Sequence, residues 1–193
     1  MSLENVEIIK GYAKLPPTHT ASPSITNQTI FATTYMRFNP NQQMQIWQNT
    51  EVQDVRYLIR VGSATDEWYV GLYKFDYPND KFTKVAQWDA VAGDLTAAGS
   101  ITLRLPSPIT LTPATYFIGF KSLNGTAQGY RANLNEQINQ IWTGDQLPNT
   151  TGGQIYNAWN VNATGSVLPS EFLRTDISLG RSSYVFYNPY LIY

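Results

Sequence analysis

Three carboxylates of this chain have aromatic neighbours, a setting that can raise a carboxyl pKa toward the values that acid catalysis requires. Glu67 precedes a tryptophan, Asp76 lies between two aromatic residues, and Asp89 follows a tryptophan. Glycoside hydrolysis needs two such groups about 5–10 Å apart across a cleft. Each of the three lies at the end of an expected strand, where Asp and Glu are ordinary turn residues, and no motif pairs them. We interpret them as turn residues and expect no enzyme activity.

The segment 76–80 carries oxygen ligands that suit a hard cation. Asp76, Asn79 and Asp80 could together bind Ca²⁺, but their spacing differs from that of an EF-hand loop, and a plain turn is the favoured interpretation. Cysteine is absent, and the one histidine, His19, lies in a segment rich in Pro, Thr and Ser. Disulfides, thiolate chemistry, histidine metal sites and a Ser-His-Asp triad are therefore not expected. We predict no catalytic residue, no metal and no cofactor.

Aromatic side chains are more suggestive of a binding role. The chain has 5 Trp and 13 Tyr, more than a core of this size requires, so some should lie on the surface. Trp142, Tyr156 and Trp159 lie among Asn, Gln and Thr residues that could hydrogen-bond to sugar hydroxyls or to another protein. For each alone, anchoring a loop on its own core is the favoured interpretation. As a group they are the predicted contact surface.

The composition restricts the classes of partner. Charged residues make up 14% of the chain, against roughly 25% in an average globular protein, and the net charge is -1. Such a surface is rich in uncharged hydrogen-bonding groups, and it excludes nucleic acid as a partner. No apolar run reaches the roughly 20 residues that span a bilayer, so no membrane insertion is expected. The N-terminus lacks the features of a signal peptide, so we expect synthesis in a cytoplasm.

These residues must be positioned by strands, because from Thr29 onward the apolar residues recur at every second position. A helix competes with strand and loop around 133–139, where apolar residues recur at helical steps. The segment 106–113 is expected to be a connection, and the aromatic C-terminus, 184–193, a final buried strand. The other expected strands are 29–38, 42–48, 54–61, 68–75, 81–88, 100–105 and 116–122.

One of these strands opens with the sequence of a tyrosine corner. Tyr116 follows Leu111 by five residues, with Pro113 between them. This spacing lets the tyrosine ring fold back so that its hydroxyl reaches a backbone group of the preceding turn, as in Greek-key sandwiches. The pattern predicts an all-β, antiparallel Greek-key or jelly-roll-like β-sandwich.

The chain divides into an arm and one domain. Residues 1–28 contain a Pro-rich stretch and are expected to form an extended N-terminal arm, in which Val6–Ile9 could add a short strand to a neighbour. Residues 29–193 are expected to form the sandwich domain. Within it, the Gly-, Asn- and Thr-rich region 143–169 is expected to be a long loop region.

The order of these features resembles the small sandwich proteins of tailed-bacteriophage virions. Such proteins carry a Leu-x-x-Gly-Thr-Tyr-Tyr strand before an Asn-Gly turn, and later a Leu-Pro before a final strand that ends near Pro-x-x-x-x-Tyr. Ala114 replaces the usual glycine. The corresponding segments here are Leu111–Phe120, Ser122–Thr126, Leu168-Pro169 and Pro189–Tyr193, and the likeness covers most of 29–193.

The resemblance implies a virion protein. The leading interpretation is a tail-fibre or receptor-binding element that contacts host-surface carbohydrate, with other virion proteins as partners and a homotrimer as the favoured assembly. The alternatives are a capsid decoration protein anchored by its arm, and a carbohydrate-binding module. A small glycan-cleaving enzyme ranks behind them, because it needs a carboxylate pair.

Overall fold

The structure is a computed structural model of the chain. It describes residues 34–38, 43–129, 131–133, 155–182, 184–186 and 190–192. Strands dominate these residues, and the one helical element among them is a short 3₁₀ turn, η3 (Arg174–Asp176). The predicted all-β, antiparallel sandwich is therefore confirmed. The predicted N-terminal arm, residues 1–28, lies outside the described residues.

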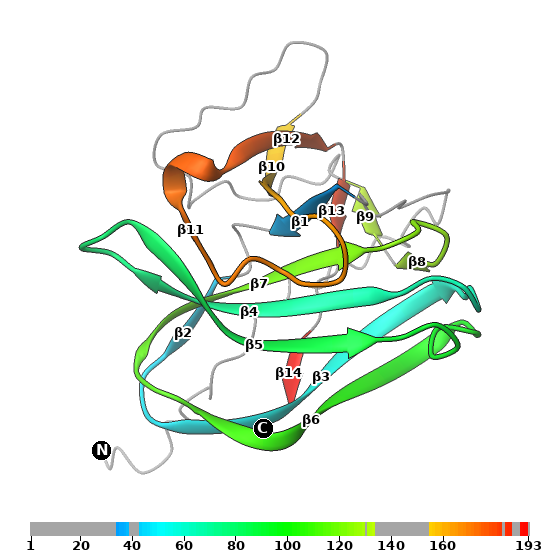
Figure 1. The fold of residues 1–193 in the computed structure, drawn as a ribbon, viewed down its shortest axis with the longest axis horizontal. Coiled ribbons are helices and arrows are strands. Elements are labelled where there is room, and N and C mark those ends of the chain that lie inside the picture. Colours follow the sequence, from blue (N-terminus) through cyan, green and yellow to red (C-terminus); the bar gives the residue numbers. More distant parts are fainter. Residues whose placement is uncertain are drawn as a thin grey trace, which may run out of the picture.

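Two antiparallel sheets face one another in a jelly-roll order (Figure 1). In the outer sheet, β3 pairs on one side with β6 and on the other with β8 and β14. In the larger central sheet, the neighbouring strands β2, β7, β4 and β5 form the second half of the jelly roll. The strands of the outer sheet are β3 (Thr50–Val61), β6 (Gly99–Leu111), β8 (Gln128–Gly129) and β14 (Tyr190–Ile192).

The central sheet has eight strands in the order β11-β5-β4-β7-β1-β10-β12, and β2 lies beside β7. A separate ribbon pairs β9 (Arg131–Asn133) with β13 (Tyr184–Phe186). The strands of the central sheet are β1 (Tyr35–Phe38), β2 (Met44–Ile46), β4 (Trp68–Asp76), β5 (Lys81–Ala90), β7 (Ala114–Ser122), β10 (Ile155–Asn162), β11 (Glu171–Leu173) and β12 (Ser178–Ser182).

The central sheet must curl, because its two edge strands are close in the chain. Leu173 ends β11 at one edge, and Ser178 begins β12 at the other. Five residue steps span at most about 18 Å, whereas six strand spacings in a flat sheet would span about 29 Å. The sheet therefore bends into the half-barrel that is visible in Figure 1.

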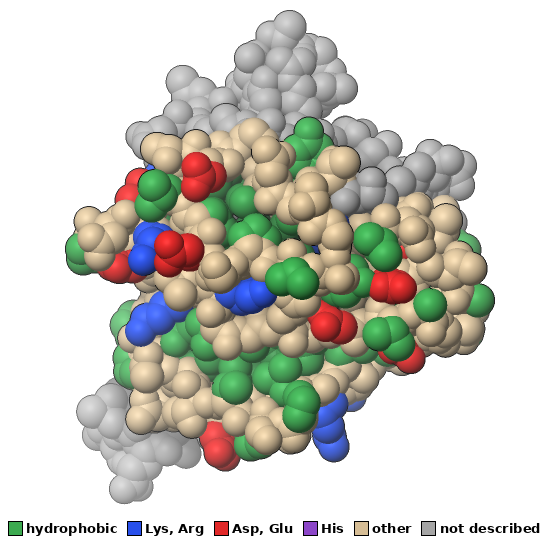
Figure 2. Space-filling model, viewed as in Figure 1, with side chains coloured by type: hydrophobic (Ala, Val, Ile, Leu, Met, Phe, Trp, Pro, Cys, Tyr) green, Lys and Arg blue, Asp and Glu red, His purple; other side chains and the backbone are tan. Residues whose placement is uncertain are grey.

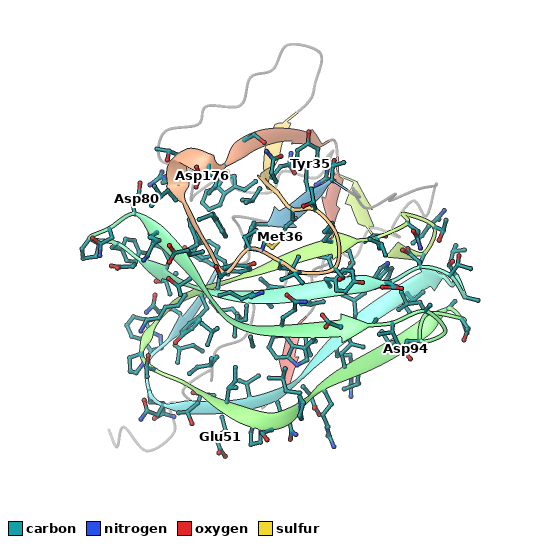
Figure 3. The ribbon with its side chains drawn as sticks, viewed as in Figure 1. Tyr35, Met36, Glu51, Asp80, Asp94 and Asp176 are labelled. Carbon is teal, nitrogen blue, oxygen red and sulfur yellow. The ribbon has the colours of Figure 1, made fainter. Side chains whose placement is uncertain are left out.

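Curling gives the central sheet a hydrophobic core on each face. The first core lies against the outer sheet and includes Tyr57, Trp68, Trp88 and Phe120. The second core fills the concave side of the half-barrel and includes Phe38, where Phe82 and Phe172 stack with ring centroids 4.7 Å apart. Met36, labelled in Figure 3, belongs to this second core. Strands β4 and β7 contribute to both cores, which explains why nearly all their residues are buried.

A pair of glycines makes room for the second core on the central strands. Gly71 and Gly119 are cross-strand partners on β4 and β7. A Cβ at Gly119 would lie 2.6 Å from the Met36 sulfur and 2.8 Å from the Phe38 ring, and one at Gly71 would lie 2.8 Å from a Leu168 methyl. The missing side chains therefore make room for the Met36 and Phe38 side chains of β1 and for Leu168, in the segment after β10.

Several predicted boundaries differ from the structure. Residues 106–111, expected within a connection, continue β6, and the pairing register of β3 with β6 shifts at this point. Proline is tolerated there because β6 is an edge strand. Strand β10 occupies part of the expected loop region 143–169, and the C-terminal segment forms two strands, β13 and β14, in different sheets. Of the helical candidate 133–139, the structure describes Asn133, which ends strand β9.

Candidate functional site

The tyrosine corner joins the two sheets at one end of the sandwich. The Tyr116 hydroxyl donates to the backbone carbonyl of Thr112 at 2.9 Å, which is the hydrogen bond that its spacing predicts. Leu111 and Tyr116 are buried, and Thr112 and Pro113 form the exposed turn between β6 and β7. The corner residues thus hold the turn through which the chain crosses from the outer sheet to the central one.

Two further turns lie at the same end as 112–113: 47–49 between β2 and β3, and 77–80 between β4 and β5 (Figure 1, left). We call this end, with its three turns, the corner end. Trp47 is 72% exposed and Tyr77 is 65% exposed, the two most exposed large aromatic side chains of the described residues. Neither was among the residues that the sequence singled out. Both carry a signal that sequence reasoning missed, since each is the first residue after a strand and begins a polar turn.

The strand register places Trp47 and Tyr77 at one level of the sheet. Thr115 on β7 pairs with Gln45 on β2 and with Phe75 on β4, and Trp47 and Tyr77 each lie two residues beyond those partners. Two residues advance a strand by about 7 Å, and strands on either side of a central one lie about 10 Å apart. The two aromatic residues therefore flank the corner turn on both sides.

Hydrogen bonds hold the corner end in place. The Thr115 hydroxyl donates to the Gln45 side-chain carbonyl at 2.7 Å and lies 3.2 Å from the Tyr77 hydroxyl. The Lys74 ammonium donates to the Thr112 hydroxyl at 3.1 Å. The Tyr77 ring also packs edge-on against Phe75, with centroids 4.6 Å apart. Tyr77 is thus exposed but fixed in orientation, as a binding residue should be.

Of the predicted contact group, the structure describes the side chain of Trp159 alone. Trp159 packs against Phe82 and Phe117, with ring centroids 6.3 and 5.8 Å away, and so anchors β10 on the second core. Tyr156 lies in β10, but its side chain is outside the described residues, as is all of Trp142.

The three candidate carboxylates each accept a hydrogen bond. Glu67 accepts from the hydroxyl of Tyr69, Asp76 from the Asn79 side-chain amide at 2.7 Å, and Asp89 from the Gln87 amide at 2.8 Å. The pKa of Tyr69 is raised to about 12, chiefly by burial, and further by Glu67 and Asp89. Glu67 and Asp89 thus lie beside the same residue, Tyr69, whereas Asp76 lies at the opposite end of β4.

The carboxylates of the candidate Ca²⁺ loop interact with other side chains of the protein. Asn79 donates to Asp76, and the Asp80 carboxylate lies 3.9 Å from the Arg174 guanidinium. Asp80 itself has a positive φ of 50°, which closes the turn, and its backbone carbonyl accepts from the Arg174 N–H at 2.9 Å. Figure 3 shows Asp80 beside the η3 turn that carries Asp176. Among the described residues no group of three or more His, Cys, Asp or Glu could hold a metal.

A buried carboxylate organises the end opposite the corner end. Asp66 is fully buried and fastens the loop before β4 to the turn after β7. Burial alone would raise the pKa of Asp66, but hydrogen bonds to its charged form outweigh this effect and hold the pKa below its usual value. Its donors are the backbone N–H groups of Glu67, Asn124, Thr126 and Ala127, the Ser122 hydroxyl and the Trp68 indole, at 2.8–3.2 Å.

Polar side chains also fasten the segment 163–170, which we call the strap, across the concave face of the central sheet. Its backbone carbonyls accept hydrogen bonds from the sheet, and burial lowers the pKa of both lysines involved, Lys84 and Lys121. The donors are Lys121 to Gly165, Gln87 to Ser166 at 3.1 Å, Lys84 to Leu168 at 2.7 Å and Tyr73 to Pro169 at 2.9 Å. The strap is therefore a structural element rather than an open binding face.

The face drawn in Figure 2 carries scattered charges rather than a cluster of one sign. Where the structure describes both partners, the ion pairs are Lys81–Glu171, Arg104–Asp54 and Arg174–Asp80. The described residues include no helix long and apolar enough to cross a membrane. Comparisons with family models, with curated proteins and with solved structures found no match to this chain.

Proposed function

We propose that this chain is a non-catalytic structural protein of a tailed-bacteriophage virion whose sandwich faces outward and contacts a host-surface glycan. The contact is made at the corner end, through Trp47 and Tyr77. The observation that carries this proposal is the exposure of these two large aromatic side chains, on either side of a turn that is fixed by hydrogen bonds.

The chemistry of the corner end suits a sugar. Indole and phenol rings offer flat apolar faces with a polar edge, which can stack on the C–H face of a pyranose. Gln48, Asn49 and Thr112 are exposed close to them in the chain or across the turn, and their uncharged groups can bond hydroxyls. The low overall charge is consistent with a neutral ligand.

Two broader arguments support the virion role. The order of strands and turns resembles small virion sandwich proteins, and the jelly-roll architecture occurs in viral capsid and lectin domains. This second argument is an analogy at the level of the fold, since one fold hosts many functions.

A bacterial surface-polysaccharide array tests the glycan contact. We expect wild type to bind a restricted set of polysaccharides, and Trp47→Ala and Tyr77→Ala each to weaken binding about tenfold, which corresponds to the loss of about 1.4 kcal/mol. Val167→Ala is the control, because Val167 is equally exposed, at 72%, but lies in the strap. Unchanged binding by both aromatic variants would exclude the corner end as the contact.

A capsid decoration protein and a carbohydrate-binding module remain the alternative functions. Light scattering of the full chain and of a chain lacking residues 1–24 separates them. A stable homo-oligomer, a trimer by the resemblance, that needs the arm supports a virion element. A glycan-binding monomer in both cases supports the binding module, whereas a monomer that binds no glycan supports attachment to a pre-built shell.

A further inference from the structure

Strands β5 and β6 approach each other along one side of the sandwich without pairing. Strand β6 is an edge of the outer sheet. On the central sheet, β11 covers the free side of β5 at Lys81–Thr83, and among the described residues no further strand pairs with that side. Figure 2 shows hydrophobic side chains gathered in the band between these two strands.

Three apolar residues of β6 line this side of the sandwich, and we call them the open seam: Ile101, Leu105 and Ile109. They pack against the first core but are only partly buried. The first core thus reaches the surface on this side, where none of the described strands covers it.

Half of the β6 edge is protected against pairing with another strand and half is not. Pro106 and Pro108 lack the N–H groups that a ladder needs, and proline is one of the residues that block edge strands. The preceding stretch 99–105 contains no proline, and its residues 99–104 pair in regular register with β3. Within the described residues its outer edge has no ladder partner and lies beside an apolar row, which is the combination that accepts an added strand.

The chain itself supplies a suitable strand. Val6–Ile9 is an apolar, β-branched run in which Val6 and Ile8 would share one face of a strand. The stretch 15–24 contains three prolines, and in an extended conformation of about 3.1 Å per residue it spans about 30 Å. In that conformation the spacer is long enough for Val6–Ile9 to reach a strand edge of a neighbouring copy.

We propose that Val6–Ile9 of one copy adds as a strand to residues 99–105 of β6 in a second copy and covers the open seam. Each copy would then donate one arm and accept another. Such a head-to-tail contact produces a closed ring if its rotation closes. The corner end lies at the other end of β6, beyond Leu111, so this assembly leaves Trp47 and Tyr77 exposed and does not depend on glycan binding.

Disulfide trapping tests the contact directly, because the natural chain has no cysteine to interfere. Glu7→Cys is mixed with a second, tagged chain that carries either Ser100→Cys or Thr102→Cys, so that two registers are covered. These β6 residues are exposed and do not belong to the seam. Thr175→Cys, exposed on η3, is the matched control.

Oxidation should give a mixed disulfide dimer with one of the β6 variants and not with the Thr175 variant. Light scattering should find an oligomer for wild type, and monomers for the Val6→Asp/Ile8→Asp variant. Trapping in neither register, or equal trapping with Thr175→Cys, would overturn the proposal. The proposal is also overturned if the double variant Glu7→Cys/Thr102→Cys forms its disulfide within a single chain, because the arm would then cover its own seam.

Discussion

The Tyr116 hydroxyl closes the one turn that carries the chain from the edge of the outer sheet into the middle of the central sheet. It donates to the Thr112 carbonyl from a buried ring. Replacing Tyr116 by Phe leaves this carbonyl without its donor, so we expect a loss of about 1–2 kcal/mol in the free energy of unfolding. Tyr35→Phe, at a partly exposed ring of β1, is the control and should change it by less than about 0.5 kcal/mol. Equal effects of the two variants would contradict a special role for the corner.

Asp66 makes the end of the sandwich opposite the corner end sensitive to acid. Its pKa is lower in the folded protein than in the unfolded chain, so its contribution to stability is fully present above the ordinary Asp range, near pH 4, and is lost as the pH falls through the lower folded pKa. Asp66→Asn removes the charge that the backbone N–H groups bond, and should cost about 2–4 kcal/mol at pH 7. Denaturant unfolding at pH 7 and at pH 3 should show that this cost shrinks in acid. A cost independent of pH would show that Asp66 is already neutral at pH 7.

At the scale of elements, the strap carries a buried side chain, Leu168, next to an exposed one, Val167. Leu168 is 1% exposed and packs over Gly71, whereas Val167 is 72% exposed. Leu168→Ala should lower the free energy of unfolding by about 2–4 kcal/mol through the cavity it leaves in the second core. Val167→Ala should change it by less than about 0.5 kcal/mol. Similar values for the two variants would mean that the strap does not pack as described.

The strands were predictable from the sequence where one face of a strand is buried, as in Asp54–Val61, whose alternating apolar residues lie in β3. Prediction was wrong where tertiary context decides. The prolines of 106–108 suggested a connection, but an edge strand tolerates them. The polar composition of β10, Ile-Tyr-Asn-Ala-Trp-Asn-Val-Asn, concealed a strand that pairs with β1 and β12 in the central sheet.

The site residues were harder to predict, because exposure is not a local property. Trp47 follows an alternating segment and Tyr77 lies in a turn, and neither setting by itself indicates whether the ring is buried; both rings are exposed. Trp159 packs on the second core, which is the interpretation favoured for it alone. Asp66 had no local signal at all, since most of its donors lie about 60 residues further along the chain.

At the scale of the whole molecule, strands β4 and β7 belong to both cores, so neither core can lose its packing without exposing the strands on which the other depends. We therefore expect one cooperative unfolding transition rather than separate unfolding of the two layers. Ile59→Ala in the first core and Leu168→Ala in the second should each shift that single transition, by about 2–4 kcal/mol. Circular dichroism and tryptophan fluorescence should report the same midpoint in each variant. A variant in which the two probes separate would show that the shared strands do not couple the cores.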